Sequence, residues 1–180
     1  KDECLPEETN RRIVDIISDV NLCYSEHARR YLMECGMPKE RTFVVGSPMA
    51  EVLRASLEKI KASDVHARLG LTRGRYILLS AHREENIDTD CNFIQLFTAV
   101  NAMAETYNMP ILYSCHPRSR KRLEATGFPL DRRVIAHEPL GFHDYNCLQM
   151  NAFAVVSDSG TLPEESSFFL SAGSPFPAVS

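Results

Sequence analysis

The sequence predicts an α/β protein with a Rossmann-like parallel sheet, and three observations indicate this class. From residue 76 onward, short apolar runs with strand character alternate with longer segments of helical periodicity. Glycine, proline and small polar residues mark the joins between them. Polar and titratable side chains follow each apolar run. Strands that alternate with helices pair in parallel through right-handed crossovers, so we expect helices on both faces of the sheet.

The first part of the chain predicts a separate group of short elements. A helix opens at residues 6–8, and its apolar residues recur at helical spacing: Ile13, Ile16, Ile17 and Val20. A strand at 21–24, a helix capped by Ser25 and a strand at 42–45 follow. The inner face of that second helix is expected to hold Ala28, Tyr31, Leu32 and Cys35. The chain then breaks at Gly46-Ser47-Pro48, which places a domain boundary near Gly46.

The rest of the chain predicts one parallel sheet with its helices. It begins with a helix whose inward residues are expected to be Val52, Leu53, Leu57 and Ile60. The expected strands are residues 76–80, 110–114, 133–136 and 152–157. The expected helices are residues 91–106, 119–125, 143–150 and 163–170. Sheets of this kind bind ligands at the carboxyl ends of their strands.

Length and composition are those of an ordinary globular protein of 180 residues, enough for one core or for one core and part of a second. A net charge of −4 gives no electrostatic support for nucleic acid or an anionic membrane as a partner. The six cysteines show no C-x-x-C pair and no zinc spacing, so we expect reduced, mostly buried thiols of a cytoplasmic protein and no metal site. No apolar run approaches a membrane span, and the ends of the sequence suggest a piece of a longer protein.

The stretch from Val155 to Glu165 carries the strongest local signal for a ligand site. An apolar run ends at Ser159-Gly160-Thr161, and a helix opens behind these small residues, with Thr161 and Glu164 at capping-box spacing. The free N–H groups of a helix N-terminus attract phosphate. Glu165 is too acidic for a phosphate shell and fits a pair of sugar or ribose hydroxyls better. An ordinary capped helix after a strand explains this stretch, taken alone, equally well.

Titratable residues also follow the other predicted strands. His82 and Arg83 follow the first strand of the sheet, and His116 and Arg118 follow the second. Parallel strands end at one edge, so these side chains are expected to meet Glu165 around the anion-binding helix start. A single histidine at a strand end is more often structural, but two with arginine neighbours favour a site for a negatively charged nucleotide. The sequence contains no G-x-G-x-x-G and no Walker motif, which argues against a dinucleotide or P-loop chemistry.

Five motifs in order and spacing resemble those of the non-hydrolysing UDP-N-acetylglucosamine 2-epimerase family. The motifs are PEETNR from Pro6, GSP from Gly46, AHREEN from Ala81, CHP from Cys115 and DSGTLPEE from Asp158. The resemblance implies two Rossmann-like domains of the glycosyltransferase-B type. On that pattern, residues 1–46 are the C-terminal part of the first domain. Residues 47–180 are the second, UDP-binding domain, truncated at its C-terminus.

The resemblance implies inversion at C2 of a UDP-linked 2-acetamido sugar, without NAD, metal or another cofactor. In the family's mechanism UDP is eliminated as the C2 proton is removed, which leaves a 2-acetamidoglycal. UDP then adds back, and the proton is delivered to the opposite face. This chemistry needs general bases on both faces of the sugar and positive groups at the departing phosphate. The family's other catalytic carboxylates precede Lys1, so the chain alone is expected to be inactive.

The resemblance also assigns roles to particular residues. Glu7 would be a catalytic acid or base, and His82 would assist catalysis at the phosphate-bearing end. The remaining residues would bind substrate. Arg83 and His116 would flank the pyrophosphate, and the turn of Ser159, Gly160 and Thr161 would bind phosphate. Glu165 would hold the ribose hydroxyls, and Tyr145 with the backbone of residues 140–142 would border the uracil.

Two departures from the common family form bear on sugar specificity. This chain has Gly160-Thr161 in place of Gly-Gly, and Arg83-Glu84 in place of Arg-Arg. They resemble the branch that forms UDP-N-acetyl-L-fucosamine for capsule or O-antigen, by C2 epimerisation of a 6-deoxy-L-sugar nucleotide. Two alternatives remain: a glycosyltransferase, which the motif at Pro6 disfavours, and a UDP-binding module without chemistry. For the full-length protein we expect a cytoplasmic homodimer that binds a UDP-sugar, and neither nucleic acid nor a membrane.

Overall fold

The structure, a computed structural model, describes residues 6–81 and 89–171. The chain divides into two compact units, Lys1–Pro48 and Met49–Ser180. Each unit contains parallel strands with helices around them.

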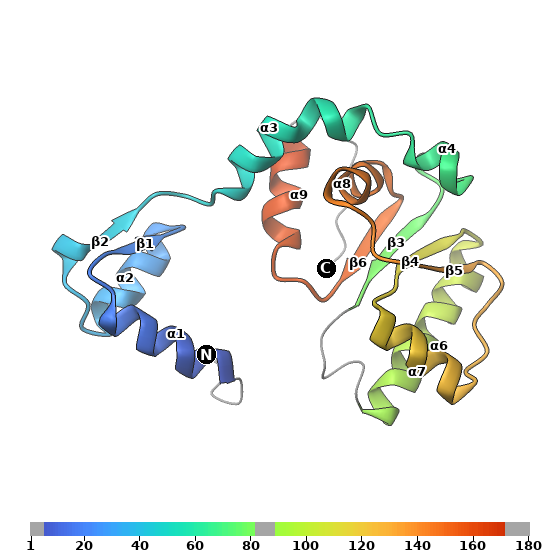
Figure 1. The fold of residues 1–180 in the computed structure, drawn as a ribbon, viewed down its shortest axis with the longest axis horizontal. Helices are drawn as coiled ribbons and strands as arrows, with labels where there is room; N and C mark the ends of the chain where they lie inside the picture. Colours follow the sequence, from blue (N-terminus) through green and yellow to red (C-terminus); the bar gives the residue numbers. More distant parts are fainter. Residues whose placement is uncertain (1–5, 82–88, 172–180) are drawn as a thin grey trace. The chain divides into compact units, whose positions relative to one another are not determined.

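The first unit holds two helices and a pair of short strands (Figure 1). Ser25 caps the second helix as predicted, because its hydroxyl accepts a hydrogen bond of 3.2 Å from the Ala28 N–H. The strands pair in parallel, with Asn21 opposite Thr42. The elements are α1 (Pro6–Ile17), β1 (Asn21–Cys23), α2 (Glu26–Glu34), the 3-10 helix η1 (Lys39–Arg41) and β2 (Thr42–Val44).

The apolar faces of α1 and α2 are largely exposed in the part of the unit that the structure describes. The predicted stripe of α1 and the residue that follows it are between 51% and 73% exposed: Ile13, Ile16, Ile17 and Val20. The prediction that one face of α2 is buried is wrong, since no residue of this helix is buried and Cys35 is exposed. The reason is geometric, because two strands of three residues form too small a sheet to cover two helices.

The second unit alternates strands and helices, which confirms the predicted pattern (Figure 1). Two helices precede the sheet: α3 (Met49–Lys61) and α4 (Val65–Leu69). The strands are β3 (Ile77–Ser80), β4 (Ile111–Ser114), β5 (Val134–His137) and β6 (Ala154–Ser157). The helices that follow them are α6 (Asp90–Tyr107), α7 (Pro117–Thr126), α8 (Phe142–Asn151) and α9 (Leu162–Ser171). Predicted ends of the strands and of α6 to α9 differ from these by one or two residues.

All four strands of the second unit are parallel, in the order β5-β4-β3-β6. From β3 the chain moves outward through β4 to β5, and it then returns to the other side of β3 to form β6. The direction of winding therefore reverses between β3 and β6. Open parallel sheets bind ligands at such a switch point, beyond the carboxyl ends of the strands.

Helices cover both faces of this sheet, and each face has its own core. On one face, Ile77 and Leu79 of β3 pack with Phe93 and Phe97 of α6. On the other face, the alternate residue Leu78 belongs to a cluster built from α3, α4, α8 and α9: Leu53, Ile60, Val65, Leu148, Leu162 and Phe169. The period-2 alternation of a strand separates the two sets. One expectation for α3 is wrong, because Val52 is 48% exposed and only Leu53 and Ile60 of the expected set are fully buried.

Candidate functional site

A pocket of about 250 Å³ opens at the switch point, beyond the carboxyl ends of the strands. Its lining comes from strand ends, the loop before α8, α8 itself and the start of α9. The lining residues are Ser80, Ser114, Pro139, Leu140, Tyr145, Ser157, Ser159, Thr161, Leu162 and Glu165. The structure therefore brings together four of the residues that the sequence predicts for a site, namely Tyr145, Ser159, Thr161 and Glu165.

A row of serines forms one side of this pocket. β3, β4 and β6 each end in a serine, and Ser80 lies opposite Ser157 in the register of the two strands. Leu79 lies opposite Tyr113, so Ser114 continues the row on the other side of Ser80. All three residues line the pocket. The sheet thus offers hydroxyls, rather than apolar side chains, at the edge where a ligand meets it.

The loop between β6 and α9 is held by its own hydroxyls. The Ser159 N–H donates to Ser157 Oγ at 3.0 Å, and the Thr161 N–H donates to Ser159 Oγ at 3.3 Å. The hydroxyls of Ser159 and Thr161 lie 2.9 Å apart. Two of the N–H groups expected to receive phosphate therefore have acceptors within the loop. The Leu162 and Glu165 N–H groups donate to carbonyls of the same loop, and Pro163 has no N–H. Phosphate binding here would use the hydroxyls, the Gly160 N–H and the positive end of the α9 dipole.

Tyr145 on α8 closes the pocket with a neutral phenol. Burial raises the pKa of Tyr145, the negative charges of Glu165 and Asp158 raise it further, and a hydrogen bond with Ser80 opposes them. The phenol therefore keeps its proton at neutral pH. It can serve as a hydrogen-bond donor and as an apolar face for a flat ring.

Glu165 lies in the first turn of α9, where its N–H donates to the Thr161 carbonyl at 3.1 Å. Its carboxylate oxygen Oε2 accepts a hydrogen bond of 2.8 Å from Gln149 Nε2 on α8. The side chain is half-buried and lines the pocket. A carboxylate accepts but does not donate, so it suits the hydroxyl groups of a ligand and repels its phosphates.

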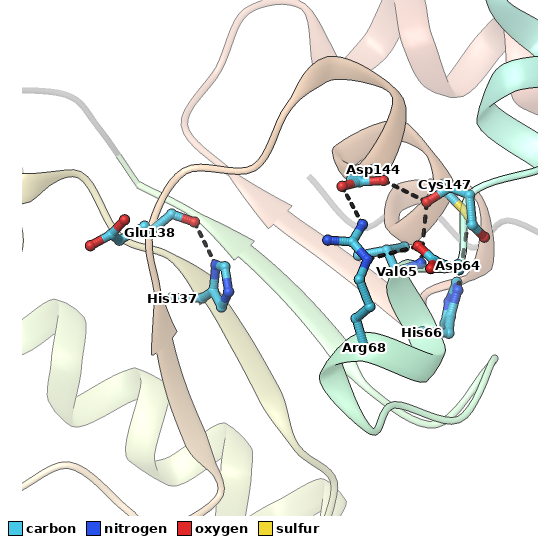
Figure 2. Close-up of polar contacts among 9 residues, drawn as sticks. Asp64, Val65, His66, Arg68, His137, Glu138, Asp144 and Cys147 are labelled. Atoms are coloured by element: carbon cyan, nitrogen blue, oxygen red, sulfur yellow. Dashed lines mark hydrogen bonds and ion pairs between the residues drawn. The ribbon is translucent and has the colours of Figure 1, made fainter.

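Polar contacts anchor α8 to α4 and to the segment before it (Figure 2). Asp144 accepts from Ser63 Oγ at 2.6 Å and from Arg68 Nη2 at 2.5 Å, and these bonds lower the pKa of Asp144. Figure 2 shows Arg68 between Asp64 and Asp144, and His66 beside Cys147. The anchors fix the helix that carries Tyr145 and Gln149.

The other predicted site residues lie elsewhere. His116 is exposed and caps α7, where its Nδ1 accepts from the Arg118 N–H at 3.3 Å. It lies two residues beyond the pocket residue Ser114, outside the lining. His82 and Arg83 lie outside the described residues. Glu7 belongs to α1 in the first unit, and its side chain is likewise outside them.

Sequence reasoning missed the serine row and Gln149. The serines had a visible signal, because three of the four predicted apolar strands end in Ser. Gln149 had none, since its partner Glu165 is on another helix. A further hollow of about 420 Å³ lies in the first unit and is lined by Arg12, Asp15, Ile16, Leu32, Cys35 and Met37. Ile16 brings the exposed apolar face of α1 into its lining.

The described residues show neither a metal-binding cluster nor a membrane-spanning helix. Residues 6–81 and 89–171 contain no group of three or more His, Cys, Asp or Glu side chains that could hold a metal ion. Within the same ranges, no helix combines the length and apolar character needed to cross a membrane.

Comparisons with known proteins identify the family. The sequence model of the family described as UDP-N-acetylglucosamine 2-epimerase matches residues 1–172. A solved UDP-N-acetylglucosamine 2-epimerase from Rickettsia bellii is 41% identical with a TM-score of 0.82, over 99% of this chain and 46% of that one. The Methanocaldococcus jannaschii enzyme, solved in complex with UDP-GlcNAc and UDP, is 27% identical with a TM-score of 0.84, over 98% and 49%.

This chain is also similar to a relative that is named for another substrate. UDP-2,3-diacetamido-2,3-dideoxy-D-glucuronate 2-epimerase from Pseudomonas aeruginosa is 28% identical over 92% of this chain and 45% of its own length. The chain spans about half the length of the curated relatives it matches. The predicted α/β class, with Rossmann-like parallel sheets of the glycosyltransferase-B type, is confirmed by the solved structures. Together the pocket, the sheet topology and these matches lead to one conclusion: the chain belongs to the UDP-N-acetylglucosamine 2-epimerase family.

Proposed function

We propose that the full-length protein epimerises a UDP-linked 2-acetamido sugar at C2, in the manner of UDP-GlcNAc to UDP-ManNAc, and that its second domain, residues 47–180, holds UDP. One observation carries this proposal. In a chain of this family, Tyr145, Glu165 and the loop from Ser159 to Thr161 line one pocket at the switch point of a parallel sheet. The complex of the M. jannaschii relative with UDP-GlcNAc and UDP supports it.

The pocket suits the uridine end of such a substrate. Its volume of about 250 Å³ is below the roughly 300–1,000 Å³ typical of sites that enclose a whole drug-sized ligand. We place the uracil against Tyr145 and the backbone of residues 140–142, and the ribose hydroxyls on Glu165. The diphosphate then extends toward Ser159, Gly160 and Thr161 at the start of α9. Arg83 and His116 would flank it from the neighbouring strand ends.

Gly160 supports a close approach of phosphate to this loop. A Cβ at Gly160 would meet no atom within 4 Å, so the fold itself leaves room for a side chain. The missing side chain therefore serves a ligand group that approaches the loop from the pocket, rather than the packing of the fold. A phosphate oxygen bound by the Gly160 N–H is such a group.

The chemistry is an elimination followed by an addition. A general base removes the C2 proton, the C–H electron pair forms the C1=C2 double bond of a 2-acetamidoglycal, and the C1–O bond breaks with its pair going to UDP. In the return step UDP oxygen attacks C1, and an acid on the opposite face protonates C2. We assign Glu7 as one of these acid-base groups and His82 as the group that assists at the phosphate-bearing end.

Three alternatives use the same site. The first is the branch that forms UDP-N-acetyl-L-fucosamine, which the departures at Gly160-Thr161 and Arg83-Glu84 favour. The second is a glycosyltransferase that moves the sugar to an acceptor, and the third is a module that binds UDP without chemistry. The expectations of a homodimer, a cytoplasmic location and a role in surface polysaccharide stay predictions of this proposal.

Isotope exchange in deuterated water separates these alternatives. Full-length protein is incubated with UDP-GlcNAc, and separately with the 6-deoxy-L-sugar nucleotide, and C2 deuterium is measured by NMR. Incorporation indicates an epimerase and identifies its sugar, transfer to an acceptor indicates a transferase, and binding alone indicates a module. The variant Glu7→Gln should lose the exchange and keep its UDP affinity. Glu34→Gln, an exposed glutamate at the end of α2, is the matched control and should keep both. Undiminished exchange in Glu7→Gln would remove Glu7 from its role.

A further inference from the structure

We propose that Gln149 is a positioning residue, which holds the carboxylate of Glu165 in the orientation that receives the two ribose hydroxyls. The inference rests on the proposed function, because it takes Glu165 as the ribose-binding group. It adds a residue that is absent from the pocket lining and was not among the predicted site residues.

Gln149 lies behind the pocket, between α8 and α9. Its side chain is fully buried, and its Nε2 donates to Glu165 Oε2 at 2.8 Å. α8 and α9 both pack on α3, so the bond joins two neighbouring helices of one layer. The bond is charge-assisted, which places it among the stronger hydrogen bonds of a protein.

The charge of Glu165 determines how the amide is turned. An ionised carboxylate only accepts hydrogen bonds, so the NH₂ group of Gln149 must face it. The amide oxygen Oε1 is then left buried, and it has no hydrogen-bond partner among the described residues. A buried acceptor without a donor destabilises a fold and so offsets the stabilisation from the bond to Glu165, and a leucine or methionine would remove both effects. Stability alone therefore does not account for glutamine at this position, whereas orientation of Glu165 does.

The effect on binding follows from the length of the glutamate side chain. A free glutamate explores several rotamers, and ordering it when a ligand binds lowers the affinity. With Oε2 already held by Gln149, the carboxylate is ordered in advance, and its other lone pairs remain for a diol. Gln149 thereby acts on the ligand through Glu165 without touching it.

The test compares two nucleotides that differ only in the groups Glu165 would bind. Affinities of the full-length protein for UDP and for 2′,3′-dideoxy-UDP are measured by calorimetry, for the wild type and for Gln149→Leu, Gln149→Met, Glu165→Gln and Gln149→Leu/Glu165→Gln. The ratio of the two dissociation constants reports hydroxyl recognition, and a purely structural role would not move it. Gln95→Met changes an exposed glutamine on α6 and is the matched control.

We expect the preference for UDP to fall about tenfold in both Gln149 variants, with an unfolding midpoint close to that of the wild type, because the lost bond and the removed unpaired acceptor oppose each other. The double variant should lose no more preference than Glu165→Gln alone, since both changes remove one function. If Glu165→Gln loses the preference and both Gln149 variants keep it, the positioning role is wrong and the proposed function stands. If Glu165→Gln itself keeps the preference, the ribose-binding role of Glu165 fails, and the inference fails with it.

Discussion

The buried histidine of the second unit predicts a loss of stability in mildly acidic solution. His66 is 9% exposed, and its Nε2 lies 3.0 Å from the Tyr76 hydroxyl, which itself donates to the Leu148 carbonyl at 2.5 Å. With its own proton on the Leu148 carbonyl, the Tyr76 oxygen accepts from His66, so Nε2 of the ring carries a proton. Its other nitrogen, Nδ1, faces Cys147 Sγ at 3.9 Å. Burial, and then the charge of Arg73, lower the pKa of His66 below its usual 6.5.

The sign of the effect follows from proton uptake. Below pH 6.5 the unfolded chain protonates His66 while the folded unit does not, so unfolding takes up a proton. Stability is therefore complete above pH 6.5 and falls as the pH drops from 6.5 toward the lowered pKa of the folded state. One proton changes the free energy of unfolding by at most about 1.4 kcal/mol per pH unit. With an m-value of about 2 kcal/mol/M in urea, the midpoint shifts by at most about 0.7 M per pH unit.

Urea denaturation between pH 5 and 7.5 measures this slope. The full-length wild type is compared with His66→Leu, which removes the titrating group and leaves the bond from Tyr76 to Leu148. We expect the variant to be less stable at pH 7.5 and to have a flatter pH profile than the wild type. Equal slopes in the wild type and His66→Leu would refute the neutral, buried state of His66.

Two further predictions concern the anchor of α8 and the loop before α9. Asp144→Ala should lower the free energy of unfolding by about 1–2 kcal/mol, because Ser63 and Arg68 both lose a charged acceptor. Asp64→Ala removes the more exposed partner of the same Arg68 and should cost about 0.5 kcal/mol or less; equal losses in a thermal melt would contradict the anchor. Gly160→Ala should leave the unfolding midpoint unchanged, since a Cβ there meets no atom within 4 Å. It should weaken UDP binding about tenfold by displacing a phosphate oxygen, and unchanged affinity in a titration would exclude that contact.

The strands and the convergence of site residues were predictable because both depend on local pattern. Apolar runs of strand length, each followed by a helix, leave few topologies, and parallel strands place all their carboxyl ends at one edge. Ser159, Thr161 and Glu165 follow from that rule together with the helix start behind them. Tyr145 came from the family resemblance, and the pocket contains it.

Features that depend on packing between distant segments could not be predicted in this way. The bond between Gln149 and Glu165 requires the relative placement of two helices, which no local pattern gives. The helix cap that His116 Nδ1 forms on α7 was not predicted either, because it depends on the turn before α7, and the role of His116 at a pyrophosphate stays a prediction. The apolar stripe of α1 predicted the helix correctly, while its burial depends on what packs against it, and the described part of the first unit does not cover it.

The chemical character of the pocket bears on which parts of a nucleotide sugar would lie inside it and which would lie outside. Among the described lining residues there is a carboxylate, Glu165, with five hydroxyl groups and one phenol, and no Lys, Arg or His. Such a lining favours neutral hydrogen-bonding groups, and the carboxylate repels phosphate. On the proposed function, the two negative phosphates of UDP then lie at its border, where the Gly160 N–H and the positive end of the α9 dipole favour them. In the proposed reaction this border is also where the C1–O bond breaks. The uridine stays bound in the pocket while charge develops outside it, so UDP remains in place for the return step.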